Sequence, residues 1–271
     1  MKKVSFQGEH GAYSESAIKR FFKEKIETVP CNSFEDALKI TENEDSDYCI
    51  LPVENSIEGT VGQSIDAITH TKLYAMGEKY FKVEHCLIST GKLEDIETVY
   101  SHPQALGQCS DFIQNRKLKT VPTYDTAGSV KIIKEMNDIH SAAIASNDAG
   151  NLYGIPIVKH GIENNVNNYT RFLIFSKENT TETGNDKTSI IFSVKHEPGT
   201  LYQILKEFND NDINLTKIES RPNKNKNWEY NFFVDFLGHY SNSKIKSVLD
   251  IISENTIFFK IIGSYTIADL D

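Results

Sequence analysis

Hydrophobic and polar residues follow two alternating periodicities over the first two thirds of the chain. Residues 14–25 carry apolar side chains at helical spacing, whereas residues 48–53 form the short apolar run of a buried strand. Ser33, three residues before Asp36, resembles a helix-capping box. The same criteria predict further strands at residues 3–7, 28–31, 99–101, 120–122, 142–145 and 169–175, and helices at residues 59–69, 104–114, 126–136 and 146–153. This alternation predicts an α/β fold with a mostly parallel sheet.

Two segments interrupt the alternation. Residues 79–88 read as extended chain with no helix before the second α/β series, and residues 164–168 form an asparagine-rich polar loop. We therefore expect two α/β lobes, joined by two crossings of a hinge near residues 77–84 and 163–168. A cleft between such lobes faces the carboxyl ends of the strands, where loops bind ligands.

The last third has a different order of elements. Residues 179–186 are polar, lack apolar periodicity and read as a linker. After it, the pattern predicts strands and helices in the order β-α-β-β-α-β, which is the ferredoxin-like plan. These elements span residues 188–194, 199–209, 213–218, 229–237, 243–252 and 257–262. We expect a domain at residues 1–178, the linker, and a smaller domain at residues 187–271.

Composition narrows the class of protein. The 271 residues carry a net charge of -9, and an acidic surface argues against nucleic-acid binding. No stretch approaches the roughly 20 apolar residues of a membrane span. Lys2 and Lys3 are not followed by the apolar run of a signal peptide, so we expect a cytoplasmic protein. The four cysteines are far apart, which predicts free thiols rather than a zinc or redox site.

Four polar clusters lie where predicted strands end. Residues 8–15 hold glycines before a helix, whose backbone N–H groups could bind an anion, although an ordinary glycine turn is the simpler interpretation. Asn55 and Ser56, within residues 52–61, offer short neutral hydrogen-bonding groups, and turn or N-cap chemistry explains them equally well.

The third cluster, residues 101–109, opens a predicted helix with Pro103 at a suitable first position. His102 invites an acid–base role, but a histidine beside a proline at a helix start is more often structural. In the fourth cluster, strand alternation places Thr170 and Phe172 on one face and Arg171 on the other. An ordinary strand explains that triplet on its own, and no single cluster names a reaction.

Taken together and in order, the clusters resemble the prephenate dehydratase family. Its patterns are G-x-x-G-x-Y-S-E, V-E-N-S-x-x-G-x-V, S-H-P-Q-A-L-x-Q-C and T-R-F, and each is present in this chain. The C-terminal third resembles an ACT domain and holds that family's E-S-R-P motif. The resemblance extends from about Lys3 to Ile267. It implies two α/β lobes similar to type II periplasmic binding proteins. No long helical segment precedes Val4, unlike the fused chorismate mutase–dehydratases.

The resemblance implies a reaction and a set of site residues. Prephenate loses CO₂ and its ring hydroxyl to give phenylpyruvate, and because aromatisation drives the reaction, no metal or other cofactor is expected. The implied catalytic residues are Thr170, as proton donor or relay, with Asn55, Ser101 and Gln108. The implied substrate-binding residues are Tyr13, Ser14, Ser56, Gly59, Thr60, Gln104, Arg171 and Phe172.

Three alternatives stay open at this point. Arg171 could neutralise a substrate carboxylate or form a structural salt bridge. Arogenate, in which an amino group replaces the side-chain keto group, could be the substrate. A two-lobed cleft with a sensory domain also suits a solute-binding protein without catalytic activity, although the lack of an export signal and the intact Thr170-Arg171-Phe172 triplet argue against it.

The ACT resemblance implies feedback by L-phenylalanine and a homodimer or homotetramer. One motif departs from the family pattern, because G-A-L-V is replaced by Gly199-Thr200-Leu201-Tyr202, which should narrow the ligand pocket and alter affinity. The implied effector-binding residues are Pro198, Gly199, Thr200, Leu201, Glu219, Ser220, Arg221 and Pro222.

Overall fold

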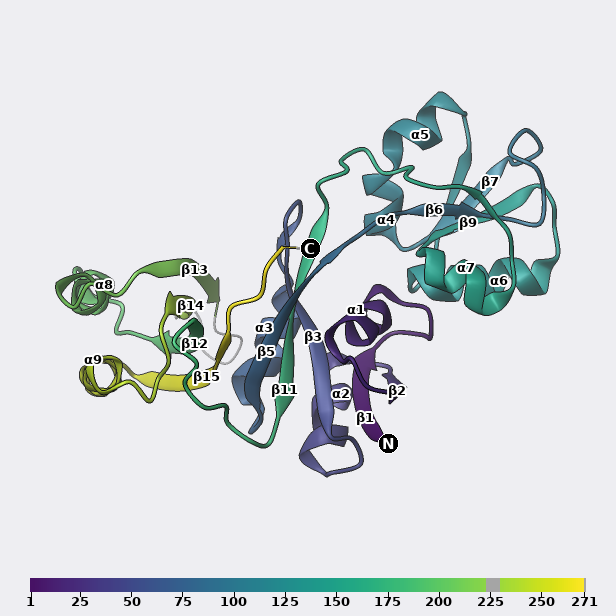
Figure 1. Ribbon diagram of the computed structural model, residues 1–271. Coiled ribbons are helices and arrows are strands. Elements are labelled where there is room, and N and C mark those ends of the chain that lie inside the picture. Colours follow the sequence, from purple (N-terminus) through teal and green to yellow (C-terminus); the bar gives the residue numbers. More distant parts are fainter. Residues whose placement is uncertain (223–229, 271) are drawn as a thin grey trace.

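The chain folds into three bodies arranged in a row (Figure 1). A first α/β lobe lies in the middle, a second lobe lies at one end, and the C-terminal domain lies at the other. The computed structural model describes residues 1–222 and 230–270. Residues 223–229 and 271, including Glu229 at the start of a predicted strand, lie outside the described residues.

The first lobe is a sheet in the order β2-β1-β3-β11-β5, with the short β4 paired to β3. Its strands are β1 (Lys2–Gln7), β2 (Ile26–Cys31), β3 (Tyr48–Asn55), β4 (Gly59–Thr60), β5 (Tyr74–Lys82) and β11 (Tyr169–Ser176). Its helices are α1 (Tyr13–Phe21), α2 (Phe34–Glu42) and α3 (Gly62–His70). Ser33 caps α2 by accepting a hydrogen bond from the Asp36 N–H at 3.0 Å, which confirms the predicted cap.

The second lobe is a sheet in the order β10-β6-β9-β7-β8. Its strands are β6 (Cys86–Ile88), β7 (Thr98–Ser101), β8 (Lys119–Pro122), β9 (Ser141–Ala145) and β10 (Ile157–Lys159). Its helices are α4 (Pro103–Gln108), α5 (Ser110–Asn115), α6 (Thr126–Met136) and α7 (Asn147–Tyr153). The helix predicted at residues 104–114 is therefore two helices, because Cys109, at φ -112° and ψ 18°, turns the chain between them.

The expectation of a mostly parallel sheet is wrong. β1 runs parallel to β2 and β3, and β7 runs parallel to β8 and β9. However, β11 is antiparallel to both β3 and β5, and β6 is antiparallel to both β9 and β10. Alternating elements predict parallel pairing only for strands joined by a crossover within one sheet. β6 and β11 instead enter their sheets from the other lobe, after the hinge crossings.

The C-terminal domain has the predicted β-α-β-β-α-β order, with the sheet β13-β14-β12-β15. Its elements are β12 (Asp186–Ser193), α8 (Thr200–Asp210), β13 (Leu215–Pro222), β14 (Tyr230–Leu237), α9 (Ser243–Glu254) and β15 (Phe258–Thr266). Figure 1 shows both helices on the face of this sheet that points away from the first lobe. The other face is therefore turned toward the first lobe.

This C-terminal sheet shares a hydrophobic core with the first lobe. Ile191, Phe233 and Ile262 belong to the same buried cluster as Leu51 and Val53 of β3. β15 passes so close to β5 that a Cβ on Gly263, whose φ is +156°, would lie 2.2 Å from the Ala75 carbonyl oxygen. The two bodies thus share one hydrophobic core, and their backbones meet closely at Gly263 and Ala75.

Among the described residues, no helix has both the length and the apolar character to cross a membrane. The four cysteines are buried and free.

Candidate active site

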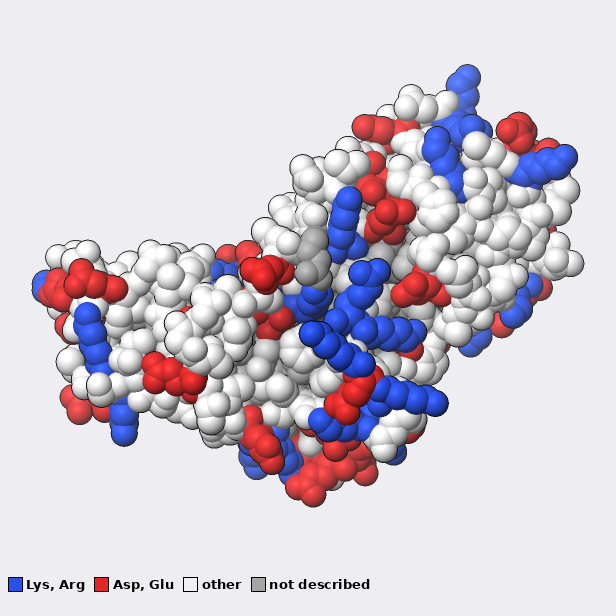
Figure 2. Space-filling view, viewed as in Figure 1, with Lys and Arg blue, Asp and Glu red and all other residues white. Residues whose placement is uncertain are grey.

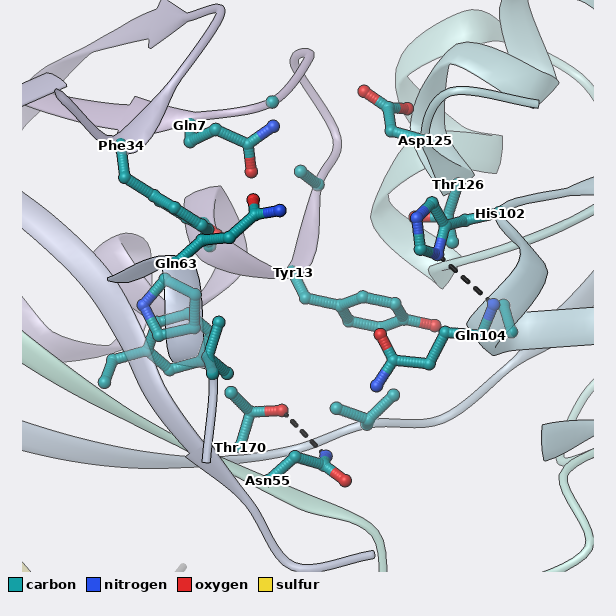
Figure 3. A pocket seen from close by; sticks show the side chains of 18 of the residues that line it. Gln7, Tyr13, Phe34, Asn55, Gln63, His102, Gln104, Asp125, Thr126 and Thr170 are labelled. Atoms are coloured by element: carbon teal, nitrogen blue, oxygen red, sulfur yellow. Dashed lines mark hydrogen bonds between the residues drawn. The ribbon is translucent and has the colours of Figure 1, made fainter. Parts of the chain in front are cut away.

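A cavity of about 560 Å³ lies between the two lobes. It is lined at the starts of five helices, α1, α2, α3, α4 and α6, together with the ends of β3 and β11. Figure 3 shows Gln7, Phe34 and Gln63 of the first lobe facing His102, Asp125 and Thr126 of the second, with Tyr13 between them and Thr170 beside Asn55. The cavity is therefore the cleft that the two hinge crossings predict.

The cleft has an unusual charge for a site expected to bind prephenate, which is a dianion with a ring carboxylate and a pyruvyl carboxylate. None of its lining residues is Lys or Arg, and its carboxylates are Glu35 and Asp125. Figure 2 shows basic side chains gathered over the middle of one face of the molecule, rather than within the cleft lining. Any anion in the cleft must therefore be held by backbone N–H groups at helix starts and by neutral side chains.

Two of the five helix starts are suited to this task. Side chains cap the first turns of α2, α4 and α6, from Ser33, His102 and Asp125. Neither α1 nor α3 has such a cap, since Ala12 and Val61 occupy their N-cap positions. The N–H groups of an uncapped first turn lack a helical partner and carry the positive end of the helix dipole. The cleft thus offers two uncapped helix starts at which a carboxylate can bind, although the first turn of α1 also carries the Glu15 carboxylate.

Thr170 is oriented by a neighbouring amide. The Asn55 side-chain oxygen accepts hydrogen bonds from the backbone N–H groups of Ile57 and Glu58, both at 3.0 Å. This fixes the Asn55 amide so that its Nδ2 donates to Thr170 Oγ1 at 3.1 Å and to Asn168 Oδ1 at 2.7 Å. Because Thr170 Oγ1 accepts from Asn55, its own hydrogen is available to a group in the cleft.

The network continues from the hinge to Tyr13. Gln108 Oε1 accepts from Asn168 Nδ2 at 3.0 Å and lies 2.9 Å from His85 Nε2. The other ring nitrogen of His85 lies 2.8 Å from the Tyr13 hydroxyl. Burial lowers the pKa of His85, which favours the neutral ring, and the Tyr13 hydroxyl donates its hydrogen to the Glu84 carbonyl oxygen at 2.8 Å. One chain of hydrogen bonds therefore joins both lobes through the hinge.

The structure brings part of the predicted site together. Of the implied catalytic and substrate-binding residues, those that line the cleft are Tyr13, Ser14, Asn55, Gln104, Gln108, Thr170 and Phe172. The remaining five do not line it. They are Ser56, Gly59, Thr60, Ser101 and Arg171.

Each of these five has another role in the fold. Ser101 is fully buried and its hydroxyl donates to the Ile144 carbonyl oxygen at 2.6 Å, which ties β7 to β9. Ser56 binds the returning hinge strand, donating to Asn167 O and accepting from Tyr169 N. Gly59 and Thr60 form β4, which pairs with the end of β3.

The structure also corrects the interpretation of Arg171 as a substrate ligand. Strand alternation turns this side chain away from Thr170, as predicted, and buries it against the C-terminal domain. Its guanidinium forms ion pairs with Glu78 at 2.7 Å and Asp235 at 2.5 Å. The structural salt bridge, which the sequence left as an alternative, is the arrangement found.

Several residues of the cleft were not predicted. His85 lies in the extended stretch at residues 79–88 and Asn168 in the predicted hinge, while Gln63 lies in a helix with no motif of its own. Asp125 and Thr126 open α6, where a capping pattern could have indicated a helix start facing the cleft. The unpredicted polar residues of the cleft and its network include Gln7, Gln63, His85, Asp125, Thr126 and Asn168.

A second cavity, of about 430 Å³, lies in the C-terminal domain. The predicted effector residues Pro198, Gly199, Thr200 and Leu201 line it, together with Tyr202, Tyr230 and Phe232. Residues 219–222 do not line it. Arg221 instead extends toward the first lobe, where its Nη2 lies 3.4 Å from Asp66 Oδ2. The two predicted halves of the effector site are therefore separate within one described chain.

Comparison with known proteins gives consistent results. Residues 4–180 match the family model of prephenate dehydratase, and residues 188–253 match that of the ACT domain. A bifunctional chorismate mutase/prephenate dehydratase of Aquifex aeolicus is 37% identical over 97% of this chain and 73% of its own length.

Two solved structures are similar over 98% of the chain. One is a prephenate dehydratase from Arthrobacter aurescens in complex with L-Phe, with a TM-score of 0.91, 27% identity and 90% of its own chain covered. The other is GqqA, described as a novel type of quorum quenching acylase, with a TM-score of 0.89, 29% identity and 98% of its own chain covered.

Proposed function

The chain belongs to the prephenate dehydratase family of lyases, and from this premise we propose that it converts prephenate to phenylpyruvate under feedback control by L-phenylalanine. The observation that carries the catalytic part is the orientation of Thr170. Its oxygen accepts a hydrogen bond from Asn55, which leaves its hydrogen for the leaving group. We also assign residues 1–178 to the dehydratase domain, 179–186 to the linker, whose last residue Asp186 opens β12, and 187–271 to the regulatory domain.

The chemistry needs placement more than a strong acid. As the ring carboxylate leaves as CO₂, its bonding electrons complete the aromatic ring, and the ring hydroxyl departs as water after gaining a proton. A threonine hydroxyl is a weak acid, so Thr170 acts by hydrogen bonding to the oxygen on which negative charge develops, or by relaying a proton to it. Asn55 supports this by donating to Thr170 Oγ1.

The substrate's two carboxylates suit the two uncapped helix starts. In this proposal one carboxylate binds at the first turn of α1, near Tyr13 and Ser14, and the other at the first turn of α3, near Gln63. Gln104 and Gln108 contribute neutral donors from the second lobe. Lysine or arginine side chains are not required, since helix termini bind anions through N–H groups and dipoles.

Regulation is assigned to the cavity of the C-terminal domain. Gly199 has φ +88° and precedes α8, so a ligand can approach the backbone at the helix start. L-phenylalanine would place its carboxylate there and its ring among the apolar lining of this cavity. We further propose that the enzyme is cytoplasmic and forms a homodimer or homotetramer, in which residues 219–222 of one copy complete the effector site of another.

One assay on the full chain tests the catalytic proposal. Purified protein is given prephenate or arogenate, and phenylpyruvate and phenylalanine are measured as the respective products. We expect turnover of prephenate. Turnover of arogenate alone would transfer the assignment to that substrate, and absence of turnover with both would reject the dehydratase proposal.

Calorimetry with L-phenylalanine tests the regulatory proposal separately. The full chain is preferred to a truncation at Lys187, because the C-terminal domain shares its core with the first lobe. We expect saturable binding and loss of activity. Tyr202→Val should tighten binding, since Tyr202 lines the cavity and is bulkier than the valine of the family pattern. No binding heat and no inhibition would reject feedback while leaving the catalytic assignment intact.

A further inference from the structure

We propose that Arg171 is a positioning residue for the dehydration step and that Asp235 of the C-terminal domain is its anchor. The state of the C-terminal domain would then determine where Thr170 sits in the cleft. This inference rests on the proposed role of Thr170 as the hydrogen-bond donor to the leaving group.

All three nitrogens of the Arg171 guanidinium have partners. Nε donates to Glu78 of β5 at 2.7 Å, Nη1 to Asp235 of β14 at 2.5 Å, and Nη2 to the Tyr265 hydroxyl of β15 at 2.8 Å. Two of these partners belong to the C-terminal domain. A planar guanidinium held at three points has little freedom to rotate or shift.

The surrounding charges depend on one another. Lys187 Nζ contacts both oxygens of Glu78, at 2.8 and 3.0 Å, and Ser189 donates to Asp235 Oδ1 at 2.5 Å. All of these side chains are at least nine-tenths buried. Two cations and two anions thus balance in the interior, and removing one partner leaves an uncompensated buried charge. The position of Arg171 is therefore sensitive to Asp235.

Thr170 must follow any movement of Arg171, because the two residues are adjacent on β11. The pairing of β11 with β3 is irregular at this point, with a register shift between Arg171 and Phe172. Bulged strands are less firmly fixed by their ladder and re-aim the neighbouring side chains. Pairing with β5 stays regular from Tyr169 to Ile174, so the irregularity is confined to the β3 side of β11. On that side the Asn55 amide and, from the opposite face, the Arg171 anchor supply the contacts that set the Thr170 direction.

The C-terminal domain contacts the neighbours of two more cleft residues. Lys217 of β13 forms an ion pair with Glu54 at 3.0 Å, next to Asn55. The Arg221 guanidinium lies so close to Gly62 that a Cβ there would be 2.1 Å from Nη1, and Gln63, which follows, lines the cleft. Contacts of the C-terminal domain thus adjoin Thr170, Asn55 and Gln63.

The anchor also lies on the strand that borders the effector cavity. Tyr230 and Phe232 of β14 line that cavity, whereas Phe233 and Asp235 face the first lobe. A ligand that shifts β14 would therefore shift Asp235, three residues beyond Phe232. β14 thus connects the effector cavity to the Arg171 anchor through one rigid element.

The test compares two single substitutions in the full chain. Asp235→Asn removes the anchoring charge with little change in shape. Lys260→Met is the matched control, because Lys260 Nζ makes another, half-buried polar contact between the C-terminal domain and the first lobe. It donates to the carbonyl oxygens of Ile68 and Thr69, near the far end of α3 from the cleft. Both variants should lower the unfolding temperature.

The two variants should differ in catalysis. We expect Asp235→Asn to lower kcat on prephenate about tenfold, with KM changed by less than about threefold, because positioning matters most in the transition state. Lys260→Met should keep kcat within about twofold of wild type. Tyr265→Phe removes one hydrogen-bond acceptor of Arg171 and keeps the aromatic ring. It should also lower kcat, but by less than Asp235→Asn does.

The outcomes separate this inference from the proposed function. Wild-type kcat in both Asp235→Asn and Tyr265→Phe would overturn the positioning role, and if Asp235→Asn does not fold, Tyr265→Phe alone decides it. An equal kcat loss in Lys260→Met would also overturn it, because a general loosening of the interface would then suffice. A wild-type chain without prephenate turnover would instead reject the dehydratase proposal. If L-phenylalanine inhibits wild type, Asp235→Asn should be inhibited less.

Discussion

The two faces of strand β11 carry opposite kinds of chemistry. On one face Thr170 opens into a cleft whose lining includes two carboxylates and no lysine or arginine side chain. On the other face Arg171 is 4% exposed and sits in a balanced cluster of buried charges. Consecutive residues of one motif thus face the proposed substrate site and the domain interface.

This difference shows how one short motif can serve both catalysis and control. In the proposed function, the cleft binds a dianionic substrate through helix starts and neutral side chains. It therefore has no lysine or arginine that would bind the product as tightly as the substrate. The interface uses fixed charges, because each buried ion must keep its partner. In our proposal, moving a partner of Arg171 on the interface side moves Thr170 on the cleft side, because one peptide bond joins the two residues. The following predictions test how separate the two faces are.

The largest effect is expected on the cleft face. Thr170→Ala should lower kcat on prephenate by about 10²–10⁴, since it removes the positioned donor to the leaving oxygen. KM should change little. Thr170→Ser is the control, because it keeps the hydroxyl and should retain most of the activity. A folded Thr170→Ala protein with wild-type kcat would remove Thr170 from the mechanism.

The second-largest effect is expected on the interface face, where a substitution that clashes with the backbone should lower stability. In Gly263→Ala the new methyl group would meet the Ala75 carbonyl oxygen, and the left-handed φ of +156° adds strain. We expect a loss of about 1–3 kcal/mol in the free energy of unfolding, as in other overpacked sites. Denaturant titration measures it, with Gly161→Ala as a control, where φ is also positive, at +60°, but a Cβ would meet open space. Equal stability of the two variants would contradict the tight packing of β15 on β5.

Two polar residues of the second lobe should separate catalysis from stability. Gln108→Ala should reduce kcat/KM by a factor that corresponds to a loss of about 1–3 kcal/mol in transition-state stabilisation. The reason is that Gln108 lines the cleft and joins His85 to Asn168. Ser101→Ala should instead reduce stability by about 1 kcal/mol and leave kcat/KM near wild type, because its hydroxyl ties β7 to β9. The reverse pattern would return Ser101 to the active site.

The smallest effect concerns pH and His85. Burial lowers the pKa of His85 below its ordinary value of 6.5, so the unfolded chain binds a proton more readily than the folded one. The free energy of unfolding should therefore decrease as the pH falls below about 6.5. His85→Gln, which keeps a polar side chain, should make this decrease shallower. Identical pH dependence in both proteins would show that His85 is not held neutral.

Much of the architecture follows from the sequence because its causes are local. Helical spacing of apolar residues, the Ser33 cap and short apolar runs specify helices and strands from contacts between near neighbours. The β-α-β-β-α-β order of the last third emerges in the same way. The ordered motifs identify Thr170, Asn55, Gln108 and Tyr13 as cleft residues, and strand alternation separates Arg171 from Thr170.

The tertiary structure decided those features that require segments distant in the sequence to come together. Antiparallel entry of β6 and β11 is set by the path through the hinge, which local patterns do not specify. His85 and Asn168 join the network because two hinge segments, more than 80 residues apart, come together beside Gln108. Arg171 became an interface residue because the C-terminal sheet presents Asp235 to it. Sequence fixes which groups a segment can offer, and long-range packing decides which partner each group finds.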